Sequence, residues 1–238
     1  MLYSFYMYEM EFGKICAVIP AYNASRTLKS VVDELRRYNP KINIVIIDDG
    51  STDNTKDVAA NLNVLVLEHH ENLGKGAALK SGFSTALSMG AELIITLDAD
   101  AQHNPHDIRK LFSKMEAESL DLVVGSRMSN TANMPVHRIL SNKITSKLIS
   151  WRVGQKIEDS QCGLRLIRAK LLKNINLESN RFETESELIM KSALNGFRIG
   201  SVAIETIYMR NGASAVKLIA DTLRFIKLFV TSLFWSKS

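Results

Sequence analysis

The sequence contains few of the features that mark secreted or membrane-spanning chains. Its two cysteines, Cys16 and Cys162, cannot form a disulfide framework, and neither has a partner at the spacing of a zinc site, which favours a reducing, cytosolic setting. No uncharged apolar run approaches the roughly 18 residues that a spanning helix needs. The aromatic-rich residues 1–12 have no basic region and no small-residue cleavage site, so we expect no signal peptide.

The composition is that of a globular protein. Apolar residues make up 46% of the 238 positions and charged residues 23%, which excludes a disordered or collagen-like chain. The net charge of +5 is spread unevenly, because residues 137–173 contain nine Lys and Arg against two Asp and Glu. This basic segment could face nucleic acid, a phosphorylated ligand or an anionic membrane, or it could be a solvated helix surface.

Two hydrophobic periodicities alternate along the first 125 residues. Short runs of β-branched apolar residues are separated by stretches with helical spacing, which is typical of an α/β fold with a buried, mostly parallel sheet and helices on both faces. The expected strands are 15–19, 42–47, 64–67, 93–97, 122–124 and 198–207, with a turn and strand at 159–165. The expected helices are 26–38, 55–62, 76–89, 105–117, 138–151 and 185–194.

Acidic residues follow the predicted strands, where ligands bind in such sheets. Asp98 and Asp100 come directly after strand 93–97, and Gln102 follows them. Two carboxylates at one strand end can hold Mg²⁺ or Mn²⁺, to which Gln102 would add a neutral oxygen. Asp49 ends the second strand and is expected to contact a nucleoside, whereas Asp53 is expected to cap the next helix.

A cationic residue and a glycine-rich segment also follow predicted strands. Arg127 follows the fifth strand and is a natural phosphate ligand. Residues 72–76, NLGKG, open the third predicted helix, but they have neither the spacing of a P-loop nor the third glycine of a dinucleotide-binding motif. We therefore expect an anionic ligand at this sheet edge, held by a binding loop of neither of those two kinds.

The last segment, residues 213–235, is amphipathic at helical spacing. One face would carry Val216, Ile219, Leu223, Ile226, Phe229 and Leu233, and the other Lys217, Asp221, Arg224 and Lys227. A basic polar face opposite Phe and Trp residues suits a membrane surface. Docking on the protein's own core or on a dimer partner explains the pattern equally well, so both alternatives stay open.

Seven segments in fixed order resemble the inverting, nucleotide-sugar-dependent glycosyltransferases of family two, which have the Rossmann-like GT-A fold. They are VIPAYN, IIDDGSTD, NLGKGAALKSGF, LDADAQHNP, VGSR, DSQCGLRLI and ETESELIMKSALNGFRI, and they cover about residues 14–210. The chain looks most like the dolichyl- or polyprenyl-phosphate mannose and glucose synthases. The resemblance implies a catalytic domain over residues 1–212, followed by an amphipathic membrane-surface tail over 213–238.

The matched motifs imply roles for individual residues. Substrate contacts would come from Pro20, Tyr22, Asp49, Asp98, Ala99, Asp100, Arg127, Arg138 and Arg210, and metal ligands from Asp98, Asp100 and Gln102. Asp159, Arg127 and Arg165 would form the catalytic group, with Asp159 as the candidate base and Arg165 and Arg138 on the acceptor phosphate. Glu185 and Glu187 lie at a helix start near the acceptor side in relatives, although Glu185 could equally be a first-turn charge favoured by the helix dipole. Ala24 stands where the family usually has an acid, so that donor contact is not carried over.

The implied reaction is metal-dependent, inverting transfer of a hexose from a GDP-mannose or UDP-glucose type of donor to a polyprenyl or dolichyl phosphate. The cofactor would be Mg²⁺ or Mn²⁺. The expected partners are the donor, the lipid phosphate and a membrane surface, without nucleic acid and with oligomerisation left open. The expected location is the cytoplasmic face of the membrane, with peripheral attachment. Two alternatives remain: transfer to a soluble glycan or polysaccharide acceptor, and a non-catalytic nucleotide-sugar-binding protein.

Overall fold

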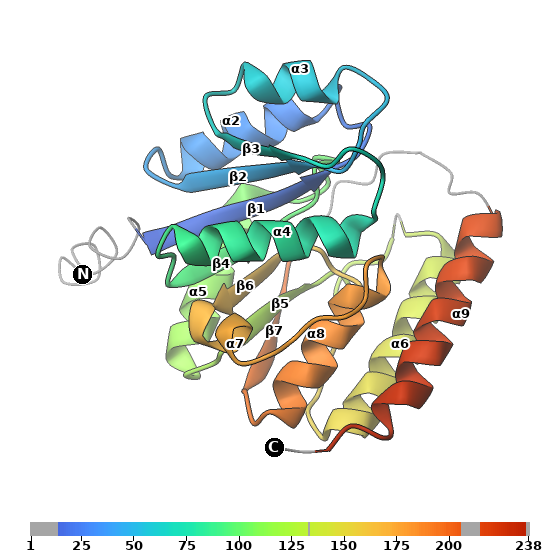
Figure 1. Cartoon of the computed structure of the whole chain (residues 1–238). Coiled ribbons are helices and arrows are strands. Elements are labelled where there is room, and N and C mark those ends of the chain that lie inside the picture. The colour runs from blue at the N-terminus through green and yellow to red at the C-terminus, as the bar shows by residue number, and fades with distance from the viewer. Residues whose placement is uncertain (1–13, 133, 206–214, 237–238) are drawn as a thin grey trace.

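A seven-stranded sheet with helices on both faces forms the centre of the computed structural model (Figure 1), which describes residues 14–132, 134–205 and 215–236, with only the backbone of 215–219. The strand order is β3-β2-β1-β4-β6-β5-β7. The strands are β1 (Ile15–Ala21), β2 (Asn43–Asp48), β3 (Leu65–Glu68), β4 (Leu93–Thr96), β5 (Leu122–Ser126), β6 (Arg165–Arg168) and β7 (Ile199–Ala203). The predicted fold class, a mostly parallel α/β sheet with helices on both faces, is confirmed.

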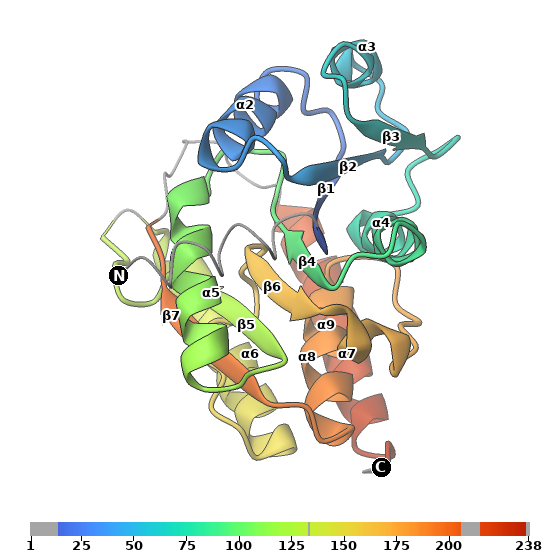
Figure 2. The same cartoon turned by 90° about the vertical axis from the view of Figure 1, so that its left-hand side faces the viewer.

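The helices form two layers, one on each face of the sheet. Figure 2 shows α2 and α5 on one side of the sheet and α4, α8 and α9 on the other. The helices are α2 (Leu28–Tyr38), α3 (Thr55–Ala60), α4 (Lys75–Ser88), the short 3-10 helix η2 (Pro105–Asp107), α5 (Ile108–Ala117), α6 (Val136–Val153), α7 (Ala169–Lys173), α8 (Glu183–Leu194) and α9 (Ala215–Ser232).

Continuous apolar sequence explains why β1 and its neighbours occupy the middle of the sheet. Val18 pairs with Val45 on β2 and with Thr96 on β4, in parallel register on both sides. Strands that are buried on both faces need apolar side chains at successive positions, and all residues of β4 are buried. The carboxyl ends of β1, β2 and β4 therefore meet at one edge.

One strand breaks the parallel pattern. β6 lies antiparallel between β4 and β5, a position for which the sequence analysis made no prediction. The hydroxyl of Thr96 donates to the carbonyl of Gly163, 2.7 Å away, just before β6 begins. The segment that precedes β6 is thereby held beside the end of β4, where Asp98 follows.

The tail helix α9 docks on the protein's own core. Leu228 is buried, and the Phe229 ring lies 6.3 Å from that of Trp151 on α6. The guanidinium of Arg152 donates to the carbonyls of Ser232 and Trp235, which fixes the end of α9 to the end of α6. The sequence left open whether this segment binds a membrane surface, the protein's own core or a dimer partner, and the structure shows docking on the core. No helix among the described residues is long and apolar enough to span a bilayer.

Candidate active site

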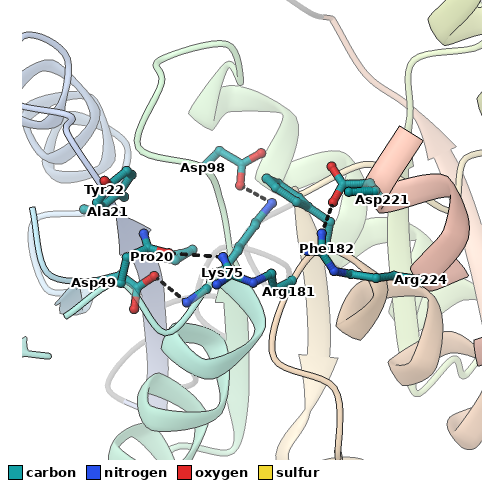
Figure 3. A pocket seen from close by; sticks show the side chains of 13 residues that line it. Pro20, Ala21, Tyr22, Asp49, Lys75, Asp98, Arg181, Phe182, Asp221 and Arg224 are labelled. Carbon is teal, nitrogen blue, oxygen red and sulfur yellow. Dashed lines mark hydrogen bonds and ion pairs between the residues drawn. The ribbon is translucent and has the colours of Figure 1, made fainter. Parts of the chain in front are cut away.

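A pocket of about 430 Å³ opens at the carboxyl edge of the sheet (Figure 3). Four predicted substrate residues line it: Pro20, Tyr22, Asp49 and Asp98. The other lining residues are Ala21, Asn72, Gly74, Lys75, Arg181, Phe182, Ala220, Asp221 and Arg224. Because Ala220, Asp221 and Arg224 belong to α9, the tail helix forms one wall of the pocket.

Lys75 is the central cation of this pocket. Its ammonium lies 2.5 Å from Asp98 Oδ1 and 3.1 Å from Glu185 Oε1, and its side chain is only 15% exposed. Burial by itself would lower the pKa of Lys75, but the two carboxylates outweigh it and hold this pKa above its usual value. Lys75 therefore stays charged at any working pH and can attract phosphate.

The two carboxylates after β4 have different surroundings. Burial would raise the pKa of Asp98, but Lys75 and His103 hold it well below its usual range. Burial and the charge of Asp98 raise the pKa of Asp100, which accepts a hydrogen bond from the Gln102 amide at 3.1 Å. The pair therefore carries negative charge that the neighbouring cations only partly compensate.

This charge pattern fits a divalent cation. No group of three His, Cys, Asp or Glu ligands occurs among the described residues. Mg²⁺ and Mn²⁺ do not need one at such sites, since one or two carboxylates with substrate phosphates complete their coordination. Asp98 and Asp100, with Gln102 beside them, are the residues that could hold an ion of this kind.

The space around Asp98 is shaped by a glycine. A Cβ at Gly163 would lie 2.5 Å from Asp98 Oδ2, closer than real Cβ atoms approach any neighbour. Only glycine at this position lets the segment before β6 pass beside the carboxylate. The sequence contained this glycine in the segment DSQCGLRLI but gave no sign of its contact with Asp98.

Asp159 and Arg127 form a buried ion pair. Arg127 Nε lies 2.8 Å from Asp159 Oδ2 and Nη2 lies 2.9 Å from Oδ1, and the Arg127 amide also donates to this carboxylate. The Asn142 side chain and the Gln161 amide donate to Asp159 as well. Burial alone would raise the pKa of Asp159, but Arg127 lowers it below its usual value.

Comparisons with known proteins decide the family. The model of "Glycosyl transferase family 2" matches residues 16–175. The chain belongs to glycosyl transferase family 2. It is 35% identical to an uncharacterised protein of Methanocaldococcus jannaschii, over 84% of each chain. It is 36% identical to the UDP-N-acetylglucosamine–dolichyl-phosphate N-acetylglucosaminyltransferase of Methanococcus voltae, over 82% of this chain and 86% of that one.

Another relative agrees with this family, and a solved structure shares the fold. The polyprenol monophosphomannose synthase of Mycolicibacterium smegmatis is 29% identical, over 79% of this chain and 75% of that one. Glucosyl-3-phosphoglycerate synthase from Mycobacterium tuberculosis, solved with UDP, has the same fold at a TM-score of 0.71 and 19% identity, covering 94% of this chain and 83% of that one. The protein is therefore a glycosyltransferase enzyme with a GT-A-like fold.

In this glycosyltransferase, the predicted base has no free oxygen. Both oxygens of Asp159 accept bonds from Arg127, and the side chain is fully buried. A general base must reach the proton that it removes. The expectation that Asp159 acts as the base is therefore not supported by the geometry, which instead favours a role in holding Arg127 in place.

Arg165 is also placed differently from its prediction. Its side chain is 1% exposed, and its guanidinium donates to the carbonyls of Cys162, Ser160 and Glu185. A guanidinium committed to three backbone carbonyls cannot contact an acceptor phosphate in the pocket. The predicted direct contact is thus corrected to a structural role, in which Arg165 joins the turn before β6 to the start of α8.

Asp49 lines the pocket but is largely committed to the protein. Its Oδ1 lies 2.7 Å from His69 Nδ1 and 3.1 Å from the Leu73 amide, and its Oδ2 accepts from Gly74 at 2.8 Å. Asp49 therefore shapes the loop that leads to Lys75. Asp53 accepts from the first amide of α3, at Thr55, but the N-cap position is occupied by Asn54, one residue after the predicted cap.

The remaining predicted residues are dispersed. The Ala99 carbonyl accepts from the Thr27 hydroxyl and lies outside the pocket lining, and Arg138 is half-buried near the start of α6. Arg210 lies outside the described residues. Glu187 accepts from the Glu178 and Ser179 amides, so it supports a loop.

Sequence reasoning missed the cations of the pocket. Lys75 stands in the glycine-rich segment 72–76, which is neither a P-loop nor a dinucleotide-binding loop. The available signals were its position at the start of α4 and its place in the matched segment NLGKGAALKSGF. Arg181 and Arg224 come from the loop before α8 and from α9. These positions are far from Lys75 in the chain, and only the fold brings them to one wall.

Proposed function

We propose that this glycosyltransferase moves a hexose, with inversion, from a nucleotide sugar to a polyprenyl or dolichyl phosphate. The observation that carries this proposal is that each carboxylate lining the described pocket is already bonded. Asp49 binds His69 and two amides, Asp98 pairs with Lys75, and Asp221 pairs with Arg224 at 2.7 Å. A hydroxyl acceptor needs a free base, whereas a phosphate acceptor is already anionic near neutral pH and needs none.

The names of the relatives support a lipid-phosphate acceptor. The Methanococcus voltae protein is named for dolichyl phosphate and the Mycolicibacterium smegmatis protein for polyprenol. Their sugars differ, so the donor class extends from GDP-mannose and UDP-glucose to UDP-N-acetylglucosamine. Transfer to a soluble acceptor stays the second candidate, because the protein with the similar fold is named for phosphoglycerate.

The pocket's side chains suit a diphosphate leaving group. Lys75, Arg181 and Arg224 would face its negative charge, which grows as the glycosidic bond breaks. Asp98 and Asp100, assisted by Gln102, would hold Mg²⁺ or Mn²⁺, and this cation would neutralise the leaving diphosphate. Arg127, positioned by Asp159, would bind phosphate where donor and acceptor meet, and Arg138 would lie on the acceptor side.

The lipid acceptor implies a place at the cytoplasmic face of a membrane. A long isoprenoid stays in the bilayer, so the enzyme must bring its pocket to the interface. We propose that α9, which lines the pocket through Asp221 and Arg224, also contacts the membrane. Residues 1–212 would then be the catalytic domain and 213–238 the attached tail.

A donor screen tests this proposal. Purified protein is incubated with Mg²⁺ or Mn²⁺, a set of GDP- and UDP-sugars, and either a short isoprenyl phosphate or the matching isoprenol. We expect transfer to the phosphate and none to the alcohol. Transfer to the alcohol or to a soluble glycan, with none to the phosphate, would support the second candidate, and no transfer or donor hydrolysis at all would support a non-catalytic binding protein.

A further inference from the structure

Helix α6, most of which belongs to the basic segment 137–173, exposes an apolar stripe. Its members recur every three or four residues, so they lie on one face of the helix. Val136 is 79% exposed, Leu140 58%, Ile144 51% and Trp151 71%, with Leu148 between them. Scattered exposed apolar residues are ordinary, but a continuous exposed stripe marks a surface that binds something.

Helix α9 carries a second exposed stripe. Its members are Leu223, Ile226 and Val230 on the helix, with Leu233 and Phe234 in the turn that follows it. The docked side of α9 is formed instead by Phe225, Leu228 and Phe229, so the helix is apolar on the face it buries and also on the face it leaves open. The core does not need this second apolar face.

The two stripes meet at their C-terminal ends. Trp151 closes the α6 stripe and contacts Phe229 of α9, and Arg152 bonds the last turn of α9. Figure 1 shows α6 and α9 running in the same direction with their C-terminal ends together, and both helices pack against α8. The C-terminal ends of the two stripes therefore lie close together, and we call the two stripes jointly the α6–α9 face.

The charges around this face have one sign. The sequence of α6 contains no acidic residue, and Lys143 and Lys147 are exposed beside its stripe. Lys227 is exposed on α9, and Asp221, the acidic residue of that helix, is paired with Arg224. We infer that the α6–α9 face docks on an anionic lipid bilayer, with α6 contributing a contact surface of its own.

The charge pattern distinguishes a bilayer from a second copy of the chain. A two-fold interface would place the same lysines against one another, and lysine is depleted from the buried centre of protein interfaces. An anionic bilayer attracts the lysines and buries the apolar stripe together. The inference deepens the proposed function, because Arg224 of α9 also lines the pocket proposed for sugar transfer. Its evidence is the exposure of the two apolar stripes and the charge of the lysines beside them.

Vesicle sedimentation of the full-length protein tests the inference. Lys143→Glu with Lys147→Glu should lower partition onto phosphatidylglycerol-containing vesicles by at least about thirtyfold, because each basic side chain near an anionic surface contributes about fivefold. Leu140→Gln with Ile144→Gln should lower it by about tenfold, by removing apolar contact. Vesicles of phosphatidylcholine alone should bind wild type weakly.

Matched variants on other surfaces serve as controls. Lys41→Glu with Lys173→Glu makes the same change in net charge, and Leu65→Gln with Met89→Gln removes two exposed apolar side chains elsewhere. Each should bind vesicles like wild type. Equal unfolding midpoints of all variants would show that the fold is intact.

Two results would overturn the inference. One is vesicle binding by the α6 variants equal to that of their controls. The other is a wild-type dimer, seen by light scattering, that the α6 variants dissociate without losing vesicle binding, which would assign the face to a second copy. Vesicles without acceptor are used throughout, so a failure of sugar transfer to a short isoprenyl phosphate would refute the proposed function and leave this result standing.

Discussion

Replacing Asp159 with Asn separates a positioning carboxylate from a catalytic base. The Asn side chain keeps the shape but loses the charge that two guanidinium nitrogens of Arg127 contact at 2.8 and 2.9 Å. Removing one partner of a buried ion pair costs about 3–5 kcal/mol. Because the Arg127 side chain is 17% exposed and water can reach it, we expect a loss of about 3 kcal/mol in the free energy of unfolding.

The loss should depend on pH in a defined direction. Arg127 lowers the pKa of Asp159 in the folded protein, so the ion pair stabilises fully above the unfolded pKa of about 3.9. This contribution disappears as the pH falls through the lowered folded value. Urea unfolding should therefore show a constant difference between wild type and Asp159→Asn from about pH 5 to pH 8, and a shrinking difference below about pH 4.

Kinetics give the second measurement. If Asp159 positions Arg127, the variant should have a lower kcat while its kcat/KM keeps the same pH profile. The exposed Asp57→Asn is the control and should change neither quantity. An Asp159→Asn enzyme that is as stable as wild type, or whose acidic limb of the pH profile disappears, would refute the positioning role and restore the base.

Three other changes test the pocket. Lys75→Met should lower the free energy of unfolding by about 3 kcal/mol, because Asp98 and Glu185 lose their shared cation. It should also weaken donor binding, measured by calorimetry, at least tenfold, and unchanged donor binding would show that Lys75 is not part of the donor site. Asp100→Ala should abolish transfer with an unchanged unfolding midpoint, and full activity in EDTA would exclude the metal. Gly163→Ala should reduce kcat at least tenfold because its Cβ displaces the Asp98 carboxylate, and a wild-type rate would contradict that contact.

The strand and helix pattern could be predicted from local sequence because it depends on local periodicity. Apolar β-branched runs placed β1, β2 and β4 to within one or two residues, and the acids that follow them had to collect at one sheet edge. The resemblance in seven ordered motifs then identified the family. The insertion of β6 between β4 and β5 could not be predicted, since strand order depends on pairing over long sequence separations.

Only the tertiary structure determines which charged residues are buried and which groups they bond to. Asp159, Arg165 and Lys75 are all charged residues in ordered motifs, and nothing in their neighbours along the chain distinguishes them. Packing buries Asp159 against Arg127 and Arg165 against backbone carbonyls, and leaves Lys75 facing Asp98 in the pocket. The sequence also established that residues 213–235 are amphipathic, but not which side faces out. Because α9 is apolar on more than one side, only its packing against α8 and Trp151 determines which residues remain exposed.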